Sequence, residues 1–197
     1  LYFLCILVPI FLTDIVILHA LTKNEHAEQL HQMEKIAKSV QSMLSAATED
    51  SALISTSLYM DNSLQDFVSR QYASPQDYFS SYREYIHNSL LQGVSRITNS
   101  VIRVYADNET LINGSEFARL STVSQEPWYQ QYTADGYSPR LLFSYDETDG
   151  RQVLFLRGMN GLYSNKAECL LCIGINYSTL DRDFQNMGYN DSVYVCS

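Results

Sequence analysis

The chain has 197 residues, of which 46% are hydrophobic and 18% are charged, and its formal net charge at pH 7 is −9. This length allows one domain with additional elements or two small domains, and the apolar content is sufficient for a core. The acidic balance and the lack of any Lys/Arg cluster argue against nucleic-acid binding, because phosphates are recognised by grouped basic side chains.

The first 21 residues form an almost unbroken apolar stretch that begins LYFLCILVPIFL. A helix of this length rises by about 30 Å, which matches the hydrocarbon core of a bilayer. We therefore expect a transmembrane helix over 1–21. A cleaved signal peptide is the alternative, but its apolar region would be shorter and would end in small residues, whereas this stretch contains ILHA near its end. Asp14 then lies near the outer headgroups or pairs with another helix.

The next segment, 22–60, contains neither Pro nor Gly. Apolar or small residues recur there in steps of three and four, at Leu30, Met33, Ala37, Val40, Leu44, Ala47, Ser51, Ile54 and Leu58. This heptad spacing predicts one long helix. The helix could be a dimer stalk or could pack on its own domain, and both hold if its first half pairs with a second copy while its second half packs on the domain.

Two helical blocks are predicted after this helix. The first is a short helix in DNSLQDFVSRQY. The second begins with Ser74 as N-cap and Pro75 in the first turn, and Gly93 ends it. Its tyrosines recur at helical spacing, so we interpret them as a stripe that faces the core.

Strands follow the helical blocks. The segment SVIRVYADNETLI alternates and breaks at Asp107-Asn108, which predicts a hairpin. A short helix begins at Pro127, and RLLFSY, RQVLFLRGMN and ECLLCIGINY predict three further strands. A helix in STLDRDFQNMG and a last strand in DSVYVCS complete the pattern. Strands that follow one another closely favour an antiparallel sheet, and the long helix is its natural cover, so we predict an α+β fold.

No familiar catalytic or nucleotide-binding motif occurs in the sequence, since GxGxxG, Walker, GxSxG and HExxH patterns are all absent. The four histidines stand at no metal-ligand spacing. Cys169 and Cys172 form a CxxC inside a predicted strand, where residues i and i+3 point to opposite faces, so we expect small core residues. We therefore expect no catalytic residue, cofactor or metal in this segment, which favours binding or signalling.

Four stretches together, SALISTSLYMDNSLQDFVS, VIRVYADNETL, EPWYQQY and LLCIGINYSTLDRDF, resemble the extracytoplasmic Cache sensor region of YesM-type bacterial sensor histidine kinases. The resemblance implies a PAS-like antiparallel sheet packed on the long helix. It also implies a second membrane helix, a HAMP linker and a kinase core after Ser197. It divides the chain into a membrane helix at 1–21, a stalk at 22–60, a Cache lobe at 61–188 and the start of a second lobe at 189–197.

The resemblance also implies a ligand site. In related double-Cache receptors for amino acids, an Arg-x-Trp-Tyr motif holds the ligand carboxylate, and a Tyr-x-Asp and a later Asp hold its amine. The matching or nearby positions here are Trp128, Tyr129, Glu126, Tyr145, Asp146 and Asn176, with Arg157 as a compensating positive charge. Glu126 stands where the arginine is expected and Asn176 where the later Asp is expected, which argues against an amino-acid ligand. Trp128 could instead simply cap the core.

These features predict the ligand-sensing region of a membrane-bound two-component sensor histidine kinase, with the sensor lobe outside the cytoplasm of a bacterial cell. Its expected partners are a small-molecule ligand or a solute-binding protein, the membrane and a second copy of the chain. The alternatives are a Cache sensor of a chemoreceptor or cyclase, and a membrane-tethered binding or adhesion protein without kinase output.

Overall fold

The computed structural model describes residues 2–87, 89–98, 100–146, 150–159 and 168–175, and in addition 182, 185 and 186. Within the helices and strands, the side chains at 2, 4–9, 20, 97, 98, 146, 150 and 151 are not described. The chain divides into two compact units, Leu1–Leu44 and Ser45–Ser197. The sheet, the shorter helices and the candidate site all belong to the second unit.

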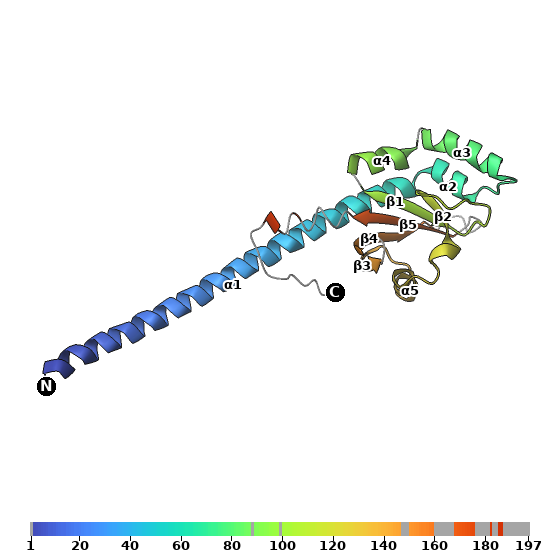
Figure 1. Cartoon of the computed structure of the whole chain (residues 1–197). Helices are drawn as coiled ribbons and strands as arrows, with labels where there is room; N and C mark the ends of the chain where they lie inside the picture. Colours follow the sequence, from blue (N-terminus) through green and yellow to red (C-terminus); the bar gives the residue numbers. More distant parts are fainter. Residues whose placement is uncertain are drawn as a thin grey trace. The chain divides into compact units, whose positions relative to one another are not determined.

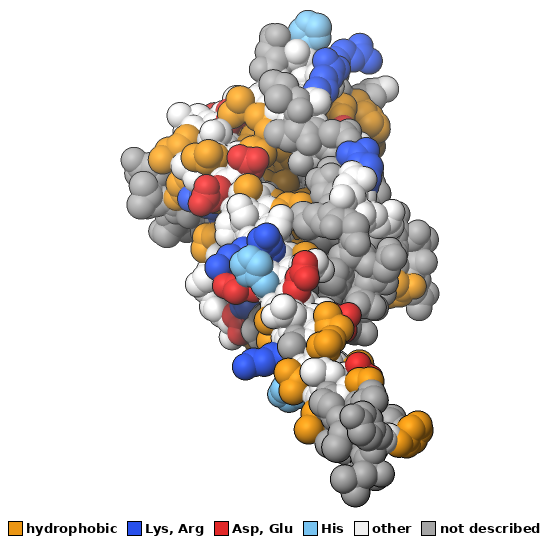
Figure 2. Space-filling model, turned by 90° about the vertical axis from the view of Figure 1, so that its left-hand side faces the viewer, with side chains coloured by type: hydrophobic (Ala, Val, Ile, Leu, Met, Phe, Trp, Pro, Cys, Tyr) orange, Lys and Arg blue, Asp and Glu red, His pale blue; other side chains and the backbone are white. Residues whose placement is uncertain are grey.

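The long helix predicted by the heptad spacing is confirmed: α1 runs without a break from Tyr2 to Tyr59 (Figure 1). Its large apolar side chains between Ile10 and Leu21 and at Leu30 and Met33 are exposed to solvent. In the part of the chain that the structure describes, no helix combines the length and the apolar character needed to cross a membrane. The face drawn in Figure 2 carries acidic and basic side chains interspersed among one another.

The second unit is built on one sheet of five strands in the order β2-β1-β5-β4-β3. The strands are β1 (Val101–Ala106), β2 (Phe117–Arg119), β3 (Arg140–Asp146), β4 (Gly150–Gly158) and β5 (Cys169–Ile175). The pairs β1–β5, β5–β4 and β4–β3 are antiparallel. β1 and β2 are parallel, with Val104 opposite Phe117. The sheet is therefore mixed, and the prediction of an antiparallel sheet was wrong at this edge.

The predicted hairpin at Asp107-Asn108 does not form, because Asn108 anchors the chain to a helix instead. Its buried amide Nδ2 donates to the backbone oxygens of Val68 and Arg70, at 2.9 and 2.8 Å. Its Oδ1 accepts from the backbone N and the hydroxyl of Thr110. The chain continues past this point and returns beside β1 in the same direction, so β2 begins only at Phe117.

The helices of the second unit are short. They are α2 (Asn62–Ser69), α3 (Pro75–His87), α4 (Leu90–Thr98), η1 (Leu120–Val123) and α5 (Pro127–Ala134). The side chain of Asp61 caps α2, and Ser74 Oγ accepts from Asp77 N at the start of α3.

The single helix that was predicted to end at Gly93 is in fact two. Ser89 Oγ accepts a hydrogen bond from Gln92 N and so starts α4, in which Gly93 is an exposed interior residue. Of the helix predicted in STLDRDFQNMG, Arg182, Gln185 and Asn186 are helical. The rest of that helix and the predicted last strand lie outside the described residues.

Both faces of the sheet are covered. One face packs against the end of α1 and against α2, α3 and α4, and its buried cluster includes Leu58, Leu64, Phe67, Tyr78, Leu91, Ile102, Val104, Phe155, Leu171 and Ile173. The other face lies under η1 and α5 (Figure 1), and its cluster includes Tyr105, Val123, Tyr132, Leu154, Leu156 and Cys172. The expected cover of the sheet by the long helix is thus confirmed for the last turns of α1.

Candidate functional site

The Trp-Tyr pair of the sequence lies on α5, above the second face of the sheet. The side chain of Trp128 is half-buried, and its ring centroid is 6.0 Å from that of Tyr105 on β1. Tyr129 meets the edge of the Trp128 ring at a centroid distance of 6.0 Å. Trp128 therefore packs on the sheet through Tyr105, while its remaining exposed surface faces outward.

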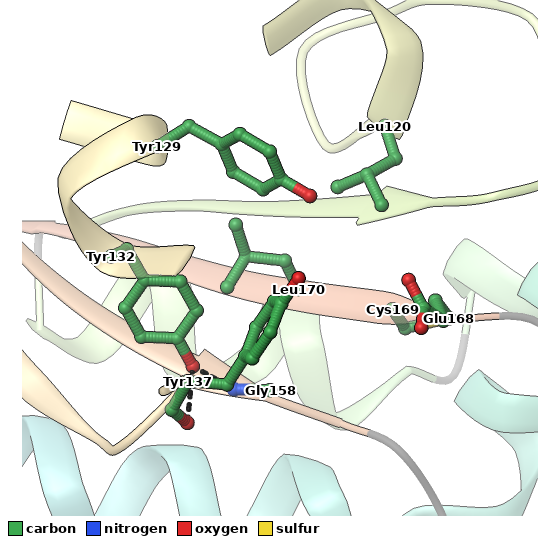
Figure 3. A pocket seen from close by; sticks show the side chains of 8 residues that line it. All are labelled: Leu120, Tyr129, Tyr132, Tyr137, Gly158, Glu168, Cys169 and Leu170. Carbon is green, nitrogen blue, oxygen red and sulfur yellow. Dashed lines mark hydrogen bonds between the residues drawn. The ribbon is translucent and has the colours of Figure 1, made fainter. Parts of the chain in front are cut away.

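A small cavity lies between α5 and the ends of β4 and β5 (Figure 3). It is lined by Leu120, Tyr129, Tyr132, Tyr137, Gly158, Glu168, Cys169 and Leu170. The space that the centre of a water molecule can reach is about 10 Å³, which is room for roughly one water. A metabolite needs a pocket of about 300 Å³ or more, so this cavity is closed to metabolites unless α5 moves away from the sheet.

Tyr132 closes the cavity from the α5 side. Its side chain is fully buried, and its Oη donates to the backbone O of Tyr137 at 2.8 Å and accepts from Gly158 N at 2.7 Å. Burial raises the pKa of Tyr132, so the hydroxyl is neutral at physiological pH and able to make both bonds. One hydroxyl group thus joins α5, the loop after it and β4.

The loop after α5 has an unusual backbone. Gly136 has φ of 80° and Tyr137 has φ of 60°, and both values lie in the left-handed region. A non-glycine residue in that region costs on the order of 1 kcal/mol, and Tyr137 is held there by its carbonyl bond to Tyr132 and by a ring contact at 5.7 Å. Sequence reasoning missed Tyr137, and the Asp-Gly pair before it was the only available signal.

Among the sequence-predicted ligand residues whose side chains are described, the structure brings together two, Trp128 and Tyr129. Glu126 precedes them as the exposed N-cap of α5, where its side chain makes no capping hydrogen bond. Tyr145 lies on β3 with 73% of its side chain exposed. Asp146 ends β3 but its side chain is not described, and Asn176 lies outside the described residues.

Arg157 lies on the opposite face of the sheet from α5. Successive residues of a strand alternate between faces, and its neighbour Leu156 belongs to the cluster under α5. The Arg157 guanidinium donates through Nη1 to Ser55 Oγ at 3.0 Å and to Thr56 Oγ1 at 2.7 Å, both on α1. Its Cζ also lies 5.0 Å from the ring centre of Tyr59. The positive charge that was expected beside Trp128 is therefore used to bind α1.

A second and larger hollow lies between α2 and α3, at about 410 Å³. It is lined by Ser63, Asp66, Phe67, Arg70, Tyr72, Ser81, Glu84 and Tyr85. Arg70 Nη2 pairs with Asp77 Oδ1 at 2.9 Å, and its guanidinium lies 5.6 Å from the ring centre of Tyr72. The hollow is within the size range of small-molecule sites. The tyrosine spacing in the sequence was interpreted as a stripe that faces the core, and it did not indicate this hollow.

The cysteines and acidic residues form no metal centre in the described part of the chain, where no group of three or more His, Cys, Asp or Glu side chains lies together. Cys169 and Cys172 are buried residues in the clusters on opposite faces of the sheet, which confirms the prediction of core residues. Burial raises the pKa of Cys172 to about 12, so it remains a thiol and is a poor nucleophile.

Comparison with known proteins gives no assignment, because neither a protein-family model nor a curated protein matches this chain.

Proposed function

We propose that the chain is the extracytoplasmic ligand-sensing region of a membrane-bound two-component sensor histidine kinase. One observation carries the proposal. A single sheet has a small cavity under α5 on one face and the last turns of a 58-residue helix on the other. Only one layer of strands separates the candidate ligand site from a long helix. A change at the site could therefore reach distant parts of the protein through this helix.

Ligand binding at this site needs a conformational change, because the closed cavity has room for about one water. A ligand that binds only when α5 has moved away from the sheet stabilises the open state by its differential affinity for that state. Such a ligand would contact Trp128 and Tyr129 on α5. Aromatic walls with few polar groups suit sugars, amines or small peptides, and a ligand-loaded solute-binding protein would act on the same surface.

The proposal assigns three roles to α1. Residues 1–21, whose side chains at 2, 4–9 and 20 lie outside the described ones, form the membrane helix. The heptad seam pairs with a second copy of the chain, and the last turns receive the state of the sheet. Leu30 and Met33 of the seam are 63% and 54% exposed in the single chain, and a parallel partner helix would cover them. Changes in the sheet would then pass to the membrane as a shift or rotation of α1.

The family and the output domain are also proposals. The five-stranded sheet on the end of a long helix is compatible with the PAS-like Cache lobe that the resemblance implies. A second membrane helix, a HAMP linker and a kinase core would follow Ser197. A chemoreceptor or cyclase output, or a tether without a signalling partner, would be revealed by the residues that follow the same lobe in the gene.

A ligand screen on the full chain tests the sensing role. The chain is held in detergent, and its melting temperature is followed by circular dichroism with amino acids, sugars and polyamines. A ligand at about 100 times its Kd stabilises by about 2.7 kcal/mol, which corresponds to a rise of about 5–10 °C for a chain of this size. If no compound raises the melting temperature, direct sensing of these small molecules is wrong, and a solute-binding protein becomes the partner to test.

Two variants then locate the site of any ligand found. Trp128→Ala should abolish the shift while the chain keeps its circular dichroism spectrum. Ser81→Leu, in the hollow between α2 and α3, should leave the shift unchanged because it is remote from α5. The opposite pattern would place the ligand between α2 and α3. Loss of folding in Trp128→Ala would instead assign Trp128 to the core.

A further inference from the structure

We infer that Arg157 and Gly158, two adjacent residues at the end of β4, couple the position of α5 to the position of α1. The inference rests on the proposal that the cavity under α5 is the sensing site, and it names the residues by which that site is read. Under this inference, separation of α5 from the sheet and weakening of the contact between β4 and α1 occur in one transition.

The first half of the connection is the hydrogen bond between Gly158 N and Tyr132 Oη, at 2.7 Å (Figure 3). The same hydroxyl holds the carbonyl of Tyr137, and all three residues line the cavity. Because the free space is about 10 Å³, a ligand enters the cavity only when α5 moves away from the sheet, and Tyr132 moves with α5. The amide of Gly158 then loses its partner.

The second half of the connection is the Arg157 guanidinium. Ser55 and Thr56 each donate their hydroxyl hydrogen to the backbone O of Ala52, at 2.8 Å in both cases. Their oxygen lone pairs are therefore directed to accept from Arg157 Nη1, at 3.0 and 2.7 Å. The Tyr59 ring, one turn further along α1, lies against the same guanidinium.

This contact is suited to repeated release. Among the described residues, no carboxylate lies within ion-pair distance of Arg157. Within the described part of the chain, the guanidinium is bound by neutral hydroxyls and an aromatic ring, and its side chain is partly exposed. When the contact breaks, the Arg157 charge returns to water and no buried carboxylate is left unpaired. An unpaired buried carboxylate would have a large free-energy cost and would oppose the release of α1.

The geometry of a strand connects the two halves. The Arg157 side chain projects to the α1 face, whereas a Cβ at Gly158 would lie 3.5 Å from Tyr132 Oη and so faces α5. A shift at the end of β4 therefore moves both contacts at once. The end of β4 is held on its other side by β5, where Gly158 pairs with Leu170 and Met159 N donates to Cys169 O at 2.7 Å. The end of β4 is thus held within the sheet, between α5 on one face and α1 on the other, and is not a free loop.

Amide hydrogen exchange on the full chain in detergent, without any ligand, tests the coupling. Tyr132→Phe removes the hydroxyl and keeps the ring. We expect exchange of the Gly158 amide to rise by about fivefold or more, the equivalent of one lost hydrogen bond, and exchange at Ser55, Thr56 and Tyr59 to rise with it. The matched control is Tyr85→Phe, which removes a hydroxyl that makes no hydrogen bond of normal geometry and should change none of these amides.

The reciprocal variant is Arg157→Gln, since coupling between two sites acts equally in both directions. It should speed exchange at Gly158 and Tyr137 although it leaves Tyr132 intact. The double variant should then differ from the sum of the two single variants. A Tyr132→Phe variant that affects Gly158 but leaves Ser55 and Thr56 unchanged would overturn the inference, and so would strictly additive effects.

A general loss of stability is distinguished by Val153→Ala, a fully buried position on β4 that takes no part in the connection. If Tyr132→Phe speeds all amides in the same proportions as Val153→Ala, the effect is global and the inference is wrong. None of these measurements needs a ligand. A failed ligand screen with intact coupling refutes the sensing proposal alone, and a successful screen with no coupling refutes the relay alone.

Discussion

Tyr132 and Tyr85 form a natural pair for measuring what a buried hydroxyl contributes to this fold. Both rings contact another aromatic ring, Tyr137 at 5.7 Å and Phe67 at 5.0 Å respectively, and Phe preserves both contacts. The difference lies in the hydroxyl groups. Tyr132 Oη makes two hydrogen bonds. Tyr85 Oη is buried and makes no hydrogen bond of normal geometry with the described residues. Burial raises the pKa of Tyr85, and the nearby Ser89 hydroxyl lowers it by a smaller amount.

Tyr132→Phe should therefore destabilise the second unit by about 2 kcal/mol, because one amide and one carbonyl lose their partner. For a chain of this size, the loss corresponds to about 4–8 °C in melting temperature. Tyr85→Phe should be neutral or should stabilise by up to about 1 kcal/mol, because it removes a buried polar group that is not satisfied in the folded state.

Urea unfolding followed by far-ultraviolet circular dichroism, with both variants at one protein concentration, measures the difference. A change in midpoint without a change in slope would show that stability alone is altered. Equal losses in the two variants would refute the reasoning, since they would mean that the hydrogen bonds of Tyr132 contribute nothing beyond ring packing.

Three further predictions concern the fold that supports the site. Burial raises the pKa of Tyr72 and of Tyr78 from 10.0 to about 12, so folding favours the neutral forms. The free energy of unfolding should stay constant below pH 10 and fall as the pH rises to 12, in step with tyrosinate absorbance. A free energy of unfolding that does not change over this pH range would contradict the prediction. Asn108→Ala should cost about 2–3 kcal/mol in urea unfolding because two carbonyls at the end of α2 lose their donor; a cost no larger than that of an exposed substitution would contradict the anchoring role. Leu58→Ala, at a fully buried position of α1, should cost about 2–5 kcal/mol in the same assay, against about 0.5 kcal/mol or less for Leu53→Ala, which is 68% exposed; similar costs would mean that the end of α1 does not cover the sheet.

Local patterns in the sequence determined most of the elements correctly. The heptad spacing identified α1, the Glu-Pro step located the start of α5, period-two alternation placed β1, and apolar runs placed β3, β4 and β5. These signals are short-range, since each depends on which face of one helix or strand is apolar. They do not depend on where that element packs.

The failures were cases in which a hydrogen bond of a neighbouring or distant residue decided the outcome. Asn108 was interpreted as a hairpin residue, but its amide binds the end of α2, about 40 residues earlier in the chain. Gly93 was interpreted as a helix end, although Ser89 had already begun a new helix. In both positions the residue type was compatible with two local structures. A tertiary hydrogen bond selected one of them at Asn108, and a local cap selected one at Gly93.

The candidate site shows the same limit more strongly. Arg157 was expected to supply a compensating positive charge beside Trp128, but strand parity places it on the α1 side. The parity of a strand residue relative to its neighbours is readable from the sequence. Which face receives α5 and which receives α1 is a property of the assembled sheet, and no residue of β4 alone reveals it.

The single indole of the chain, Trp128, is placed where its emission can report on the proposed transition. It contacts the phenol ring of Tyr105 and is part of α5. Separation of α5 from the strands would move this fluorophore into a more aqueous environment and would weaken energy transfer from Tyr105. The unlabelled protein therefore contains an intrinsic optical sensor for opening, which can be read in stopped-flow mixing without attaching a dye.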